Sequence, residues 1–166
     1  MRILGIDPGY AIVGYGIVDT NGYKFGVVGY GAITTPAKMP FSKRLKAIYD
    51  DMITIIRKYE PDELAIERLY FNTNTTTAID VAQARGVIIL AAESCGVKIK
   101  EYTPLQVKQA VTGYGKAEKF QVMEMVKSLL SLKTIPKPDD TADALALAVC
   151  HGHCVGSGVS KIMREE

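Results

Sequence analysis

The chain has few of the residues from which proteins build disulfide frameworks and soft-metal centres. Its 166 residues include only two histidines and three cysteines. Cys150 and Cys154 are four apart on a predicted helix, which is poor geometry for a disulfide bond, and an odd number of cysteines cannot all pair. Their cluster with His151 and His153 lacks the spacing of a zinc finger. We therefore expect a reducing compartment, and we expect the two histidines to be helix-end residues.

Long apolar runs are also absent. The apolar run at residues 87–92 is too short to cross a bilayer, and the N-terminal MRILGID lacks the features of a secretory signal. We therefore expect a cytoplasmic protein. A chain of this length holds one hydrophobic core comfortably, but not two. Without repeats or linkers, residues 1–166 are predicted to form a single domain whose last ten or so residues are a mobile tail.

The chain has almost no excess of charge of either sign, but its basic and acidic residues are unevenly distributed along the sequence. The formal net charge is +2, yet residues 98–137 carry eight lysines against three acidic residues, while residues 138–166 are net acidic. A basic block of this kind can be the solvated face of a helix or a surface that binds a polyanion. Charge alone leaves both interpretations open.

The first half of the chain predicts three strands, a helix and a fourth strand. Residues 3–6 are an apolar run that stops at Asp7, followed by Pro8 and Gly9. Segments 14–18 and 23–33 flank Asn21-Gly22, which is a strong hairpin signal. Residues 41–59 have helical apolar spacing. The strand at 64–67 follows this helical crossover, so it is expected to lie parallel to the first strand.

The second half alternates helices with one further strand. A helix over 76–95 closes at Gly96, and residues 97–102 alternate as an edge strand does. Thr103, Pro104 and Gln106 form a helix start with a capping box. Further helices are expected over about 117–132 and 140–150. The order β-β-β-α-β-α-β-α-α-α predicts an α/β fold, a mixed five-stranded sheet flanked by helices on both faces.

Four carboxylates are placed where this fold would bring them together. Asp7 and Glu67 end two strands predicted to be parallel neighbours, and ligand sites favour that end of a sheet. Asp140 and Asp143 are three apart and share one face of a helix. Such carboxylates repel one another unless cations lie between them. Two hard divalent ions, typically ~3.5–4 Å apart in nucleases, are a common solution. Oxygen-only ligands indicate Mg²⁺, with Mn²⁺ as a substitute.

Each acid also has a purely structural interpretation. Asp140 and Asp143 suit the first turn of a helix, where carboxylates offset the helix dipole, and Asp7 could form the turn before Pro8. Glu67 is harder to explain in this way, because it continues an apolar strand. Three separate coincidences would be required, so the joint metal-site hypothesis is the stronger one.

The motifs in this order resemble those of the RuvC family, bacterial Holliday-junction resolvases of the RNase H-like superfamily. The resemblance spans essentially the whole chain. It rests on GIDPG (5–9) with GYG (14–16), LAIE (64–67), QARG (83–86), QVKQ (106–109), GYGKAEK (113–119) and DDTADALALA (139–148).

The resemblance implies an RNase H-like nuclease that cuts four-way DNA junctions. Asp7, Glu67, Asp140 and Asp143 would be the catalytic and metal-binding acids, and the family's D-x-x-D spacing selects Asp140 over Asp139. The enzyme would be a homodimer that nicks two strands of like polarity symmetrically, leaving 5′-phosphate and 3′-hydroxyl ends. The branch-migration proteins RuvA and RuvB would be its partners.

The resemblance also implies DNA contacts outside the four acids. Lys108 and Lys119 match basic residues near the DNA backbone, and Tyr70 or Phe71 matches an aromatic that stacks on a base at the crossover. Core packing remains an alternative for either ring. The polar tract 72–77 is expected to be a mobile loop or helix entry beside the site. The full set of candidate DNA-binding residues is Arg68, Tyr70, Phe71, Lys108, Lys116 and Lys119.

Two other functions compete with this one. An actin-like nucleotide-binding fragment also begins with an acidic Gly turn after its first strand, but 166 residues cannot supply the duplicated lobes that clamp a nucleotide. A non-catalytic module for branched DNA is the second alternative, because residues 113–115 between two helices resemble a helix-hairpin-helix phosphate clamp.

Overall fold

The computed structural model describes residues 1–69 and 75–156, and these ranges contain the expected succession of elements. Tyr70, Phe71 and the expected tail lie outside the described residues, as do the first residues of the tract 72–77. The elements are β1 (Arg2–Asp7), β2 (Ile12–Thr20), β3 (Phe25–Thr34), α1 (Phe41–Tyr59), β4 (Glu63–Glu67), α2 (Thr75–Ser94), β5 (Lys98–Tyr102), α3 (Pro104–Thr112), α4 (Lys119–Leu129) and α5 (Asp139–Gly156).

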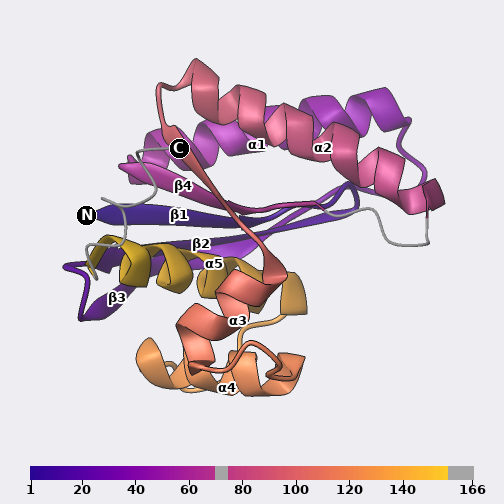
Figure 1. Cartoon of the computed structure of the whole chain (residues 1–166). Helices are drawn as coiled ribbons and strands as arrows, with labels where there is room; N and C mark the ends of the chain where they lie inside the picture. The colour runs from indigo at the N-terminus through magenta and orange to yellow at the C-terminus, as the bar shows by residue number, and fades with distance from the viewer. Residues whose placement is uncertain (70–74, 157–166) are drawn as a thin grey trace, which may run out of the picture.

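The strands form one mixed sheet in the order β3-β2-β1-β4-β5. β1 and β2 are antiparallel, as are β2 and β3, whereas β4 is parallel to both β1 and β5. This confirms the expected meander, the parallel pairing across the helical crossover and the edge position of β5. Helices α1 and α2 cover one face, and α5 lies on the other with α3 and α4 outside it (Figure 1). The predicted α/β architecture is therefore correct.

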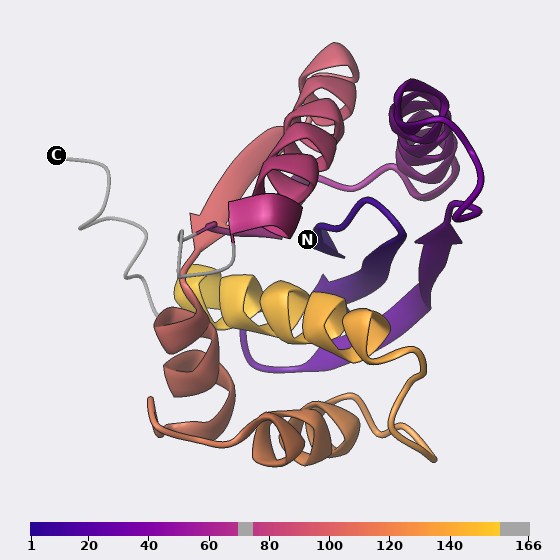
Figure 2. The same ribbon diagram turned by 90° about the vertical axis from the view of Figure 1, so that its right-hand side faces the viewer.

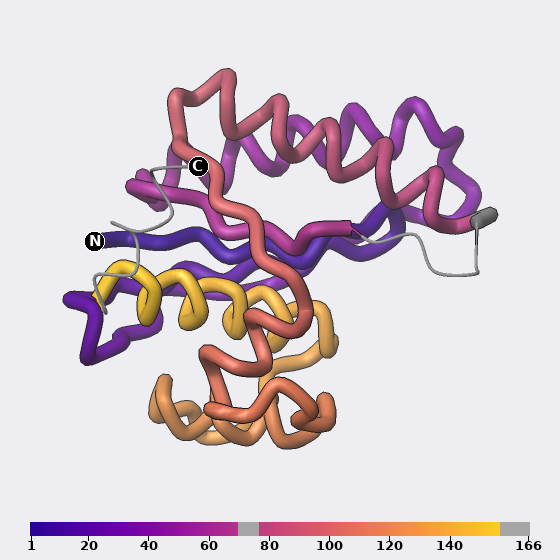
Figure 3. Tube along the Cα trace, in the orientation of Figure 1, coloured from indigo at the N-terminus to yellow at the C-terminus, as the bar shows by residue number. Residues whose placement is uncertain are grey.

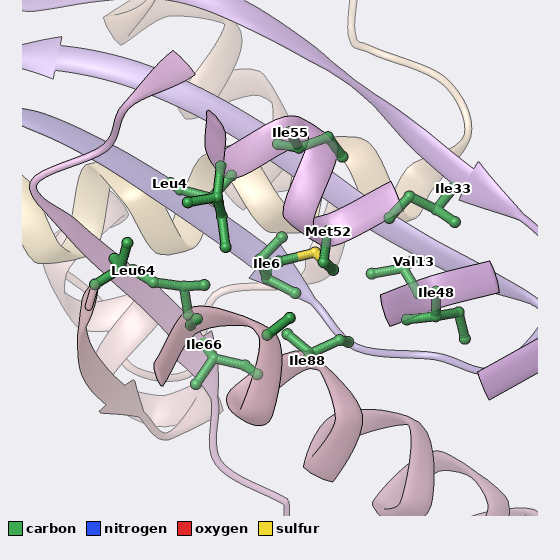
Figure 4. Packing of buried hydrophobic residues seen from close by; sticks show 14 of the residues in the cluster. Leu4, Ile6, Val13, Ile33, Ile48, Met52, Ile55, Leu64, Ile66 and Ile88 are labelled. Carbon is green, nitrogen blue, oxygen red and sulfur yellow. The ribbon is translucent and has the colours of Figure 1, made fainter. Parts of the chain in front are cut away.

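The two helices on one side of the sheet enclose the larger apolar core. Leu4 and Ile6 of β1 belong to one buried cluster with Ile48 and Met52 of α1 and Ile88 of α2, and all five side chains are fully buried (Figure 4). Burial of such a side chain contributes about 1.5–3 kcal/mol. α1 and α2 lie side by side above the sheet in Figure 2. This core keeps the central strands fixed, so their ends can position functional groups.

Strand alternation sends the other residues of β1 toward α5. Since successive side chains of a strand point to opposite faces, Ile3, Gly5 and Asp7 share the face opposite Leu4 and Ile6. Ile3 belongs to the second core cluster, which α5 completes with Leu145. The trace in Figure 3 places β1 and α5 next to each other, although they are far apart in the sequence.

Three glycines form the surface on which α5 rests. A Cβ atom at Gly5 would overlap the main-chain oxygen of Ala144, and one at Gly14 would overlap the main-chain oxygen of Asp140. A Cβ atom at Gly16 would lie 2.6 Å from Leu145. No other residue type allows the helix backbone to approach the strands this closely. We call Gly5, Gly14 and Gly16 the glycine seat of α5.

The helix starts and ends predicted from local sequence signals were mostly accurate. Thr103 accepts a hydrogen bond from the Gln106 amide, and the Gln106 side chain accepts one from the Thr103 amide, so the predicted capping box is confirmed. α4 is shorter than the predicted 117–132, and α5 continues to Gly156 instead of ending at 150. Within the described residues, no helix is both long and apolar enough to cross a membrane.

Candidate active site

Asp7 and Glu67 are the last residues of two adjacent parallel strands. The register pairs Gly5 with Ala65 and Ile6 with Ile66, so the next pair along β1 and β4 is Asp7 and Glu67. Alternation places both carboxylates on the face that α5 covers. The sequence-based expectation that these two acids emerge together at one end of the sheet therefore agrees with the fold.

α5 brings the other two acids to the same end. Its first turn contains Asp140, whose main chain rests on Gly14, and Asp143 follows in the next turn. The glycine seat thus sets the height of both residues above the sheet. Asp7 and Asp143 are far apart in the sequence, yet the charge of each of the other three acids acts on Asp7.

A cleft of about 340 Å³ opens where the strand ends meet α3, α4 and α5. It contains three of the four candidate acids and two lysines, and its remaining walls are apolar. Asp140 is not part of its lining. The lining residues are Asp7, Glu67, Asp143, Lys108, Lys119, Pro104, Val107, Val122, Ala146 and Leu147.

The negative charges of the carboxylates in this cleft are not fully offset by nearby positive charges. Burial and then the charges of Asp143, Glu67 and Asp140 raise the pKa of Asp7 to about 8, although Lys119 opposes the shift. Burial and Asp143 likewise raise the pKa of Glu67. Burial is the largest cause of the raised pKa of Asp143, again against Lys119. Carboxylates whose pKa values are raised by burial and by neighbouring negative charges are characteristic of functional sites.

Lys119 is the cation that faces these acids. Its Nζ lies 2.8 Å from Asp143 Oδ2 and 4.0 Å from Asp139 Oδ2. Burial lowers the pKa of Lys119, but the hydrogen bond to Asp143 and the charges of Asp143, Asp139 and Asp7 raise it more. Lys119 therefore remains charged at neutral pH, where it can attract a phosphate as well as a carboxylate.

The two neighbouring aspartates at the start of α5 have different surroundings. Asp139 pairs with Lys137 at 2.6 Å and its pKa is lowered by that hydrogen bond, whereas its charge is not among those that act on Asp7. The charge of Asp140 does act on Asp7. The charges of both Asp139 and Asp140 act on Asp143, so the choice of Asp140 over Asp139 stays a prediction. Helix capping explains first-turn acids but not Asp143, whose partner is Lys119 on another helix.

The acids suit a divalent metal by their chemistry. In the described part of the chain, no three His, Cys, Asp or Glu side chains stand as a preformed metal-binding group, and Asp143 is turned toward Lys119. The raised pKa of Asp7 is nevertheless what is expected of carboxylates that lack a counterion. All four candidates offer oxygen, the ligand that Mg²⁺ and Mn²⁺ prefer. The residues therefore fit such an ion.

The candidate DNA-binding residues surround the cleft unequally. Lys108 and Lys119 line it, while Lys116 is exposed on the loop between α3 and α4 and does not. Arg68 is exposed directly after β4. The two lysines of the basic block that line the cleft lie beside the acids, which favours a polyanion surface over a merely solvated helix face.

His153 lies in the last turn of α5, as expected of a helix-end residue, but His151 does not, which corrects the expectation for His151. His151 is buried within α5, where its Nδ1 lies 2.6 Å from the Tyr102 hydroxyl and its Nε2 lies 2.8 Å from Glu63 Oε2. Nδ1 of His153 instead contacts the main-chain oxygen of Ala110. Burial lowers the pKa of His151 in spite of Glu63. These side chains point to separate partners, so they tie α5 to β4, β5 and α3.

Two contributions to this site were not predicted from the sequence. The glycine seat was noticed only as part of motifs, although glycines inside apolar strands commonly mark a close backbone approach. Arg85 was also missed. Its Nε donates a hydrogen bond to the main-chain oxygen of Glu67 at 3.0 Å. The QARG motif contains this arginine, but nothing local indicates where its side chain reaches.

Comparisons with known proteins agree along nearly the whole chain. The family model described as Crossover junction endodeoxyribonuclease RuvC matches residues 3–151. A protein of that name from Halothermothrix orenii is 60% identical over 153 residues, covering 92% of this chain and 93% of the relative. The Thermus thermophilus RuvC structure is 34% identical with a TM-score of 0.88, covering 95% of this chain and 97% of that one. T. thermophilus RuvC in complex with Holliday junction substrate is 31% identical with a TM-score of 0.87 over the same shares.

Proposed function

The chain belongs to the RuvC family of crossover junction endodeoxyribonucleases, and on this premise we propose that it resolves Holliday junctions by cutting DNA strands. The supporting observation is the cleft in which Asp7, Glu67 and Asp143 lie with Lys108 and Lys119. Buried carboxylates beside lysines suit a phosphodiester, because cations held by the acids and the lysines together neutralise its charge. The family name and the cleft chemistry thus point to the same substrate.

We assign metal binding to Asp7, Glu67, Asp140 and Asp143, with two Mg²⁺ ions per site and Mn²⁺ as a substitute. The chemistry that such ions supply when bound is Lewis-acid polarisation of the phosphate and a lower pKa for the attacking water. The protein's part is to hold the four carboxylates on a rigid frame of β1, β4 and α5. Because the pKa of Asp7 is raised to about 8, metal binding at this carboxylate would displace a proton near neutral pH.

The lysines position the scissile phosphate. Lys119, which pairs with Asp143, and Lys108 of α3 both line the cleft, and both would bind the phosphate there. Water oxygen then bonds to phosphorus while the bond to the 3′ oxygen breaks. The 3′ oxygen gains a proton, so the products carry a 5′-phosphate and a 3′-hydroxyl. Such lysine contacts give salt-dependent affinity without base reading.

A synthetic four-way junction tests the proposal directly. With Mg²⁺ or Mn²⁺, the protein is expected to nick two strands of like polarity at matching positions and to leave a linear duplex of the same sequence intact. Denaturing gels of end-labelled strands measure this. Binding without any nick would favour a non-catalytic DNA-binding module, and nucleotide-dependent stabilisation in a thermal melt would revive the actin-like alternative.

We further propose that the enzyme acts as a homodimer joined through α2. Its buried face packs on the sheet through Ala84 and Ile88, but its outer face is also apolar. Ile79 and Leu90 are 57% and 58% exposed and lie on the same side of the helix, because their separation spans three full turns. Gly86 between them has open space above it. A helix that is apolar on both faces is typically covered, and a second copy covers it symmetrically.

Leu90→Glu is expected to convert the dimer into a monomer, since a two-fold contact would bring the two new carboxylates face to face. Light scattering after size exclusion measures the mass, and paired nicking of a junction should fall at least tenfold in the same variant. Tyr23→Glu is the matched control, because Tyr23 is 82% exposed in the turn between β2 and β3. An unchanged mass for Leu90→Glu would argue against α2 as the interface.

The remaining proposals follow from family membership. Residues 1–166 act as one nuclease domain in the cytoplasm, and RuvA and RuvB deliver the junction to it. Tyr70 or Phe71 stacks on a base at the crossover, where base stacking is worth roughly 1–3 kcal/mol. Arg68 and Lys116, which are both exposed, contact the DNA backbone.

A further inference from the structure

Arg85 of α2 is largely buried although it carries a permanent charge. Its side chain is 15% exposed, and its guanidinium lies between the ends of β4 and β5. Keeping an arginine in such a place costs free energy unless its donors are used. The contacts that Arg85 makes therefore indicate what it does.

The Nε–H of Arg85 donates a hydrogen bond to the main-chain oxygen of Glu67 at 3.0 Å. This oxygen belongs to the last residue of β4, and the ladder to β1 ends one pair earlier, at Ile6 and Ile66. On the β5 side, Glu67 pairs with Tyr102. The amide end of the same peptide unit, Arg68 N–H, donates to the main-chain oxygen of Tyr102 at 2.8 Å. Arg85 thus holds the oxygen end of this peptide unit, at the point where the strand ends and the carboxylate enters the cleft.

The charge of Arg85 has a separate partner. Nη2 lies 2.9 Å from Glu101 Oε2 on β5, but the two atoms are not aligned as a hydrogen bond. Glu101 is about half exposed, so water screens this pair. The contact of Arg85 with Glu67 is thus a hydrogen bond to the main chain, and the ion pair of Arg85 is made with Glu101 instead.

We propose that Arg85 is a positioning residue for the reaction: by holding the main-chain oxygen of Glu67, it fixes the direction in which the Glu67 carboxylate points into the cleft. This inference rests on the proposed role of Glu67 as a metal ligand. Some residues do not bind the metal but orient a residue that does. Replacing such a residue typically lowers metal affinity or activity 10- to 100-fold.

Arg85→Lys is the decisive variant, because it keeps the charge beside Glu101 and removes the planar Nε donor. We expect kcat for junction cleavage to fall about 10- to 100-fold with little change in KM, and the Kd for Mn²⁺ alone, measured by calorimetry, to rise about tenfold. Glu101→Gln is the matched control: it removes the charged partner and leaves the Nε bond, so both constants should stay close to those of the wild type.

Three further outcomes separate the hypotheses. Wild-type kcat and Mn²⁺ affinity in Arg85→Lys would overturn the positioning role. So would equal losses in Arg85→Lys and Glu101→Gln, since these would indicate that the ion pair matters instead.

Arg85→Gln offers a second variant if circular dichroism shows that Arg85→Lys does not fold. Glu67→Gln separates this inference from the proposed function: if that variant still cleaves, the assignment of Glu67 fails, whatever Arg85 does.

Discussion

Asp7→Asn is expected to reduce junction cleavage in Mg²⁺ by about 10³-fold or more, because the variant loses the central carboxylate of the four. Junction binding should persist, since the lysines proposed to contact the DNA backbone are unchanged. Gel-shift titration with Ca²⁺ in place of Mg²⁺ measures binding, and a time course with Mg²⁺ measures cleavage. If binding and cleavage were lost together, Asp7 would have a structural role and not a catalytic one.

The same substitution should stabilise the metal-free protein at high pH. The pKa of Asp7 is raised from 3.8 to about 8, so the folded chain holds a proton that the unfolded chain releases. The unfolding free energy of the wild type therefore falls as pH rises from about 4 to about 8. The asparagine side chain of the variant cannot ionise, so this part of the pH dependence disappears. Since one pKa unit equals about 1.4 kcal/mol, we expect a gain of roughly 2 kcal/mol or more at pH 8.

Melting curves in EDTA at pH 5.5 and pH 8 measure this effect as a difference between the wild type and the variant. Taking the difference cancels the contributions of other titrating groups. Adding Mn²⁺ at pH 8 should raise the Tm of the wild type and leave that of Asp7→Asn nearly unchanged. Parallel pH profiles for the two proteins would mean that the Asp7 carboxyl is not perturbed by its neighbours.

Gly14→Ala is expected to disrupt cleavage although Gly14 touches no substrate. The new Cβ would overlap the main-chain oxygen and carbon of Asp140 and approach Thr141 N to 2.9 Å. Main-chain atoms cannot rotate away, so the first turn of α5 must move off the sheet. Such overpacking costs typically 1–3 kcal/mol, and a displacement of about 1 Å at a reacting group can cost about 10²-fold in rate.

Gly26→Ala provides the matched control for that experiment. Gly26 lies in β3, and a Cβ there meets nothing within 4 Å. It should therefore cleave and melt as the wild type does, whereas Gly14→Ala should show a lower Tm and a much lower cleavage rate. A Gly14→Ala enzyme that cleaves at the wild-type rate would show that the glycine seat does not set the position of Asp140.

Features with local causes could be predicted from the sequence. The capping box at Thr103 depends on residues three positions apart, and the turn at Asn21-Gly22 places Gly22 at a positive φ of 93°. The parallel pairing of β1 and β4 could be predicted because two neighbouring strands joined by a helical crossover are expected to be parallel. Because alternation within these strands is also a local property, the convergence of Asp7 and Glu67 could be anticipated.

Features that depend on packing between distant segments could not be predicted. The Cys-His-Gly-His-Cys sequence resembles a helix end, but Gly152 continues α5 because its bare backbone fits against Phe25. The contact of Lys119 with Asp143 joins two helices, and Arg85 reaches the main chain of a strand from α2. No spacing within the sequence specifies such contacts, since each depends on how the layers pack.

The seating of α5 on β1 and β2 has a consequence for protein synthesis. The ribosome makes Asp7 long before Asp140 and Asp143, which arrive on a helix that must find its place on strands already formed. A nascent chain that lacks this helix holds only two of the four acids and no cover for that face of the sheet. The proposed set of four acids therefore cannot be complete before α5 has been made.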